Sequence, residues 1–89
     1  MTVFAVIAIS DAAKMGVSIT GKLQPQDYHK VDESTWLVTP PEHLVTPKEV
    51  SDFLEVTNGG SGRAIVMSVT SYYGYHMKDT WDWLVAKGA

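Results

Sequence analysis

The sequence contains no cysteine, which excludes disulfide bonds and thiolate metal sites and makes the cytoplasm the expected compartment. Basic residues are scarce: 7 Lys and Arg stand against 10 Asp and Glu, for a net charge of -3. This balance disfavours nucleic acid as a partner, because phosphate binding requires a cluster of basic side chains. The apolar run Val3–Ile9 is too short to span a membrane and lacks the basic start of a signal peptide, so we expect no membrane association.

The residues that are present are typical of one small globular domain. Apolar residues make up 45% and charged residues 19% of the 89-residue chain, which argues against wholesale disorder. We treat residues 1–89 as a single domain with a small core, because a chain of this length buries only about two thirds of its unfolded surface.

The first part of the chain predicts a strand followed by a helix. Val3–Ile9 is apolar at both odd and even positions, which is typical of a central strand covered on both faces. Ser10 or Asp11 can cap a helix that ends before Pro25. Apolar residues at spacings of three and four give this helix its buried stripe: Ala12, Met15, Ile19 and Leu23. A β-hairpin over residues 16–23 is the alternative, because two glycines weaken the helix.

The middle of the chain predicts a hairpin and a second helix. Strands at Asp27–Val31 and Thr35–Pro40 flank a polar turn, with Trp36 and Val38 on one face and Leu37 on the other. The second helix has a Thr46 cap, Pro47 at its first position and Glu49 completing a capping box. We expect it to end by residues 58–60, and its buried stripe comprises Val50, Phe53 and Leu54.

The last part of the chain predicts a long strand and a third helix. Arg63–Tyr73 is rich in β-branched residues and free of proline, and Gly74 ends it. Asp79 is the expected cap of a helix that stops at Lys87 and Gly88, with Trp81, Leu84 and Val85 on its packed face. Trp83 lies about 200° from Trp81 around this helix, so we expect it to point the opposite way.

The order of these elements predicts an α+β fold, the ferredoxin-like split βαβ arrangement β-α-β-β-α-β with an added C-terminal helix. Right-handed crossovers would place the first two helices on one face of a four-stranded antiparallel sheet. The other face is then bare, although the first strand is apolar on both sides. Either the last helix folds back over it, or two copies pack sheet to sheet. An outward Trp83 favours a second contact surface, and we expect a homodimer.

Five segments, in this order, resemble a known group of proteins: TVFAVIAIS, DYHKVDESTWLV, TPKEVSDFLEV, GRAIVMSVTSYYG and WDWL. Over nearly the whole chain they are similar to small uncharacterised SinR-like proteins, a group similar in topology to the CRISPR-associated small endoribonucleases. The resemblance implies a ferredoxin-like fold, and the endoribonucleases are dimers. It implies no established activity for the SinR-like group.

The more distant likeness to the endoribonucleases implies an alternative function. Those enzymes carry a metal-binding Asp at the end of the first strand, paired across the dimer axis, and Asp11 is the nearest match. The alternative is therefore a metal-dependent nuclease that uses Asp11. The competing interpretation of Asp11 is a helix cap, and the chain lacks the arginines that such an enzyme would use on phosphates.

Three other sequence patterns are better explained by a structural role than by a catalytic or ligand-binding role. The glycine-rich residues 58–63 lead from a helix into a strand, whereas phosphate loops lead from a strand into a helix. His29, His43 and His76 have no metal-ligand spacing, so we expect neither a metal nor a cofactor. A Ser71–His76 contact would be needed for nucleophilic catalysis, and no nucleophile-elbow pattern surrounds it.

The tyrosine-rich run after the last strand is the best candidate for a binding surface. Tyrosine combines a large apolar ring with a hydroxyl and is enriched at recognition surfaces. The run could instead stack on bases or form a small core beneath the last helix. We predict a non-enzymatic protein-interaction or regulatory module, homodimeric and open to a protein partner. Its predicted contact residues are Tyr72, Tyr73, Tyr75, His76 and Trp83.

Overall fold

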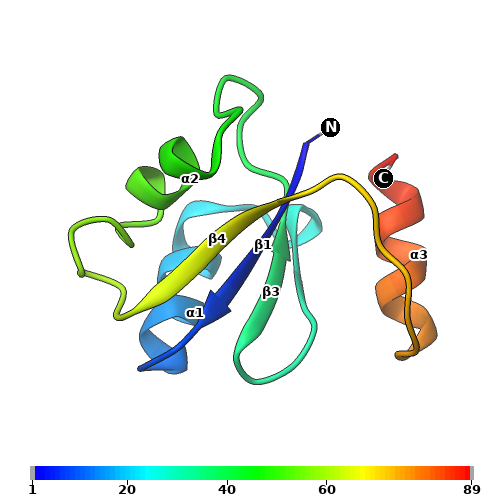
Figure 1. The fold of residues 1–89 in the computed structure, drawn as a ribbon, viewed down its shortest axis with the longest axis horizontal. Helices are drawn as coiled ribbons and strands as arrows, with labels where there is room; N and C mark the ends of the chain where they lie inside the picture. Colours follow the sequence, from blue (N-terminus) through cyan, green and yellow to red (C-terminus); the bar gives the residue numbers. More distant parts are fainter. Residues whose placement is uncertain (1, 89) are drawn as a thin grey trace.

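The computed structural model describes residues 2–88 and contains a four-stranded sheet with three α-helices (Figure 1). In chain order the elements are β1 (Val3–Ala8), α1 (Ala12–Lys22), the 3₁₀ helix η1 (Pro25–Asp27), β2 (Tyr28–Lys30), β3 (Thr35–Val38), α2 (Pro47–Phe53), β4 (Ala64–Val69) and α3 (Lys78–Ala86). The strand order is β2-β3-β1-β4 and every neighbouring pair is antiparallel. This is the predicted ferredoxin-like α+β arrangement with an added C-terminal helix.

The main core lies between one face of the sheet and the first two helices. The central strands contribute alternate side chains to it, because successive residues of a strand point to opposite faces. Helix α1 is confirmed over the hairpin alternative, and its Met15 and Ile19 are fully buried. The buried residues of this cluster are Phe4, Val6, Ala8, Met15, Ile19, Leu23, Trp36, Val38, Val50 and Leu54.

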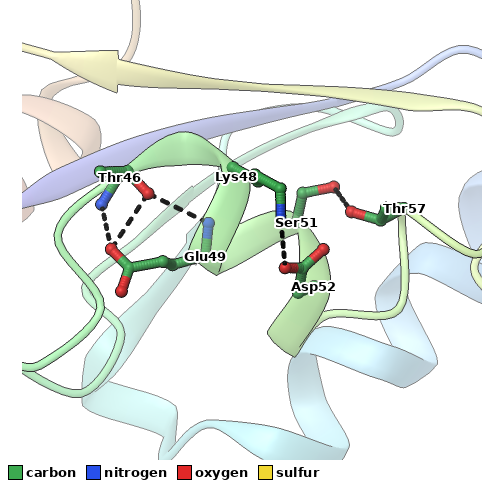
Figure 2. Close-up of polar contacts among 6 residues, drawn as sticks. All are labelled: Thr46, Lys48, Glu49, Ser51, Asp52 and Thr57. Carbon is green, nitrogen blue, oxygen red and sulfur yellow. Dashed lines mark hydrogen bonds and ion pairs between the residues drawn. The ribbon is translucent and has the colours of Figure 1, made fainter.

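Local sequence explains where α2 begins. Figure 2 shows the Glu49 carboxylate accepting from the N–H of Thr46 at 3.0 Å, while the Glu49 N–H donates to the Thr46 hydroxyl at 3.2 Å. The predicted capping box is thus confirmed. The pKa of Glu49 lies below its ordinary value of 4.5, chiefly because the Val45 N–H donates to the carboxylate and then because the Thr46 hydroxyl does.

The second face of the sheet carries a smaller core under α3. Val3 from β1, Leu37 from β3 and Leu84 from α3 are buried together there. Trp81 and Trp83 are partly buried against the same cluster. Of the two explanations for the bare face, folding back of the last helix is therefore realised. In Figure 1, α3 stands apart from α1 and α2, which lie on the other side of the sheet.

Several predicted boundaries are wrong. Strand β4 ends at Val69, so the tyrosine-rich run is not part of it, and Gly74 does not end a strand. Helix α2 ends at Phe53, within the predicted limit of residues 58–60, but the left-handed residue that follows it is Glu55, with φ 62°, and not one of the expected glycines. Helix α3 begins at Lys78 after Met77, which places Asp79 in its first turn and not at the cap.

Candidate functional site

Residues 71–77, here called the tyrosine segment, connect β4 to α3 without regular secondary structure. Tyr73 and Tyr75 are fully exposed, with relative accessibilities of 103% and 102%, and Met77 is exposed to 69%. Large apolar side chains are normally withdrawn from water when a domain folds, so these exposed rings make the segment the candidate binding surface.

The start of the tyrosine segment rests on α3. The ring of Tyr72 stacks on that of Trp81, with centroids 6.1 Å apart and planes 8° apart. Around this pair lies an open hollow of about 300 Å³, lined by Tyr72, Tyr73, Gly74, Trp81 and Val85. Its wall is mainly aromatic and aliphatic, and Val85 is exposed although the helical pattern predicts that it packs. The hollow could receive an apolar side chain of a partner.

The other end of the tyrosine segment contacts the turn that follows β2. The Nε2 atom of His76 lies 3.1 Å from the carbonyl oxygen of Val31, which follows β2, and can donate a hydrogen bond to it. His76 therefore holds the segment close to the second face of the sheet. The exposed Tyr73 and Tyr75 thus lie between two anchored residues, Tyr72, which stacks on Trp81, and His76, which contacts Val31.

Trp83 does not point away from the protein, as the helical angle predicted. Its ring stacks on His29 of β2 at 5.9 Å, and the ammonium group of Lys87 lies 5.6 Å from the ring centroid. Its indole N–H is buried without a hydrogen-bond partner among residues 2–88. Since Trp83 packs with Leu84 in the second core, its position fixes α3 on the sheet. Whether it also contacts a partner stays a prediction.

Polar contacts also hold α3 against β2 and against the 3₁₀ helix that precedes it. The Nζ atom of Lys87 lies 3.2 Å from a carboxylate oxygen of Asp27, and their side chains are only 11% and 27% exposed. This is the most enclosed ion pair of the described residues. The His29 ring also contacts the Thr80 hydroxyl. Helix α3 is consequently fixed over β2 and β3.

The region beyond α3 on the same sheet face stays uncovered. Ile65 and Met67 of β4 are 50% and 43% exposed, and the register places Ile65 opposite Ile7 of β1. These side chains form an apolar strip along an edge strand. Sequence reasoning did not single out this strip, although apolar residues at alternate positions of β4 are the signal that could have found it.

Asp11 occupies the cap position before α1. Its carboxylate accepts from the Lys14 N–H at 3.3 Å and pairs with the Lys14 ammonium group at 3.7 Å. The capping interpretation of Asp11 is confirmed. No group of three or more His, Asp or Glu side chains in residues 2–88 is arranged to hold a metal ion. The nuclease alternative stays a prediction without a described ligand set.

The other sequence patterns do not converge on the tyrosine segment. His43 lies in the loop before α2, and the glycine-rich residues connect the end of α2 to β4. Gly62 packs against the chain at the start of α1, where a Cβ atom would lie 2.7 Å from the Ser10 carbonyl oxygen. The described hydrogen bonds include none between Ser71 and His76.

No family model matches this chain, and neither curated proteins nor solved structures give a significant match. No helix within residues 2–88 has the length and apolar character needed to cross a membrane.

Proposed function

We propose that this protein is a small non-enzymatic protein-interaction module that forms a homodimer and presents the tyrosine segment to a protein partner. The complete exposure of Tyr73 and Tyr75 carries the proposal. Tyrosine buries a large area on binding and loses little conformational entropy, so two exposed rings can supply the anchors of an interface.

The anchoring of the segment supports the same function. Tyr72 stacks on Trp81 at one end and His76 reaches the Val31 carbonyl at the other. A segment that is already held before binding loses less freedom when a partner arrives. The hollow beside Tyr72 adds a place into which a partner side chain can insert.

Charge favours protein over nucleic acid as the partner. Lys78, which follows the segment, pairs with Asp82 at 2.9 Å, and Asp79 adds a further negative charge beside it. Surfaces that stack bases normally combine aromatic rings with a positively charged groove. The uncovered strip of Ile65 and Met67 supports the homodimer, because a second chain would remove these side chains from water.

Site-specific photo-crosslinking in the native host tests the tyrosine segment. A photoreactive phenylalanine analogue replaces Tyr73 or Tyr75, and the matched control replaces Val17, which is 71% exposed on α1. We expect protein adducts from both tyrosine positions and none from residue 17. Adducts no stronger than those of the control would overturn the proposed contact surface.

Light scattering on the purified chain tests the homodimer separately. The expected mass is twice the 9.8 kDa of the single chain. A mass of 9.8 kDa at every protein concentration would contradict the homodimer and leave the contact surface to the crosslinking result.

A further inference from the structure

The two edges of the sheet differ in how they are protected against pairing with another strand. Edge strand β2 has three residues, includes Lys30 and is covered by α3 through His29. Edge strand β4 has six residues, AIVMSV, with neither a charge nor a proline. Folded proteins usually block a free edge with charges, prolines, bulges or a covering segment. Within residues 2–88, no other segment forms a backbone hydrogen bond with the outer edge of β4.

The backbone of β4 shows which groups are available. The carbonyl of Arg63 accepts from the Ile9 N–H at 2.7 Å, so the alternation of an antiparallel ladder turns the polar groups of odd-numbered residues toward β1. The N–H and C=O groups of Ala64, Val66 and Ser68 therefore face outward. Among the described residues, no backbone hydrogen bond joins these outward groups to another segment.

We infer that β4 pairs antiparallel with β4 of a second copy, about a two-fold axis at Val66. This deepens the proposed function and rests on its homodimer. Val66 would lie opposite the partner's Val66, and Ala64 opposite the partner's Ser68. This register uses all three outward residues of each strand and forms about six inter-chain hydrogen bonds. The two four-stranded sheets become one continuous sheet.

The same register joins the exposed apolar side chains. Ile65 of one chain lies opposite the partner's Met67, and the reciprocal pair forms on the other side of the axis. Both side chains are about half exposed in the single chain, at 50% and 43%. Apolar side chains that lie directly opposite each other on neighbouring strands pack together and stabilise the strand pair. The uncovered strips of the two copies thus become one apolar surface across the axis.

The charge of Arg63 favours antiparallel over parallel pairing between the two copies of β4. Arg63 is the charged residue next to β4, and the register places it opposite the partner's Val69. Parallel pairing of identical strands would set the two Arg63 side chains next to each other, where like charges repel. Antiparallel self-pairing also stops at two copies, because each chain uses its β4 edge and no β4 edge is left for a third copy.

Cysteine crosslinking tests the register. The chain has no cysteine of its own, so single substitutions give a clean readout. Ile65→Cys and Met67→Cys are mixed under mild oxidation; opposite residues of this type lie about 4.5 Å apart between Cα atoms, within reach of a disulfide. We expect the mixed disulfide to form several-fold faster than the homodisulfide of either variant. Equal rates, or faster homodisulfides, would overturn the register.

Light scattering of edge variants tests the interface itself. Val66→Pro removes an outward N–H without touching the ladder to β1, and Met67→Lys adds a charge to the edge. We expect both to shift the mass from dimer to monomer, whereas Met77→Lys, changed at a residue 69% exposed in the tyrosine segment, stays dimeric. A dimer that survives Met67→Lys and forms no mixed disulfide would refute the β4 interface but keep the proposed homodimer. A monomeric wild type would refute both.

Discussion

The Nε2 atom of His29 lies 2.9 Å from the hydroxyl oxygen of Thr80, and this contact joins β2 to α3 across 51 positions of the sequence. Thr80 is only 4% exposed, and the His29 ring also stacks on Trp83. One histidine therefore fixes the last helix through a hydrogen bond and a ring contact. The stability of α3 on the sheet should depend on this pair.

Removing the Thr80 hydroxyl should lower the stability of the fold. Thr80→Val keeps the shape of the side chain but leaves His29 without its partner, so we expect the free energy of unfolding to fall by about 1–2 kcal/mol. Urea unfolding followed by tryptophan fluorescence measures it. The control is Thr20→Val, whose exposed hydroxyl bonds to its own helix at 2.9 Å, and equal losses in the two variants would contradict the docking role.

Shortening Trp83 should affect folding more than shortening an exposed tyrosine. Trp83 packs in the second core, so Trp83→Ala should cost about 2–4 kcal/mol of stability. Tyr73→Ala, at a fully exposed ring, should change stability by less than about 0.5 kcal/mol. Thermal unfolding of the two variants compares them. If Trp83→Ala unfolded with the wild-type midpoint, the packing of α3 described above would be incorrect.

The charge of Glu49 should make the stability depend on pH. Its folded pKa lies below 4.5, so its contribution is fully present above pH 4.5 and is lost as the pH falls through the folded value. Glu49→Gln should therefore be less stable than the wild type at neutral pH, with the difference closing below pH 4.5. Unfolding midpoints across this range check it, with Glu42→Gln in the preceding loop as the control. A difference independent of pH would exclude the charge as its cause.

Two glycines should respond to alanine in opposite directions. Gly62 has φ 84°, and a Cβ atom there would lie 2.7 Å from the Ser10 carbonyl, so Gly62→Ala should lower stability by about 2–3 kcal/mol. Gly21 lies within α1 with no atom within 4 Å of its added Cβ, and Gly21→Ala should raise stability by about 0.5–1 kcal/mol. Chemical denaturation of both variants decides the signs. Similar effects at the two positions would contradict the close approach at Gly62.

Local patterns predicted most of the fold. The capping box of α2 depends on residues three positions apart, Thr46 and Glu49, and such signals survive in any tertiary context. The hairpin was also predicted correctly, with Trp36 and Leu37 on opposite faces, because alternation in a strand is a local property. The order of these elements was sufficient to predict the sheet topology.

Features that depend on distant residues were not predictable in this way. The β propensity of the chain continues past Val69, but β1 begins at Val3, which already pairs with Val69, so later residues have no partner strand. Helix α2 ends early where the hydroxyls of Ser18 and Ser61 bind the Leu54 carbonyl at 2.8 Å and 2.6 Å. In both cases contacts with other parts of the chain, and not the local sequence, determine where the strand and the helix end.

The positions of the candidate site residues in the fold were predicted only in part. The tyrosine segment stood out by composition, and Tyr73 and Tyr75 are exposed as a binding surface requires. Trp83 was placed on the wrong side, because an angle of about 200° from Trp81 leaves both rings on the flanks of Leu84, where indoles are long enough to reach one core. The angle around a helix predicts the direction in which a side chain leaves the helix, but it does not predict how far a long side chain can bend toward the core.

The attachment of α3 has a consequence for how the molecule opens. The helix follows an irregular connection and is fixed by contacts that span 51 and 60 positions, whereas β1 pairs with two strands in the centre of the sheet. Segments joined in this way exchange their amide hydrogens through local unfolding that leaves the rest intact. We therefore expect α3 to open as a local unit, which would expose Val3 and Leu37 to water while the main core stays folded.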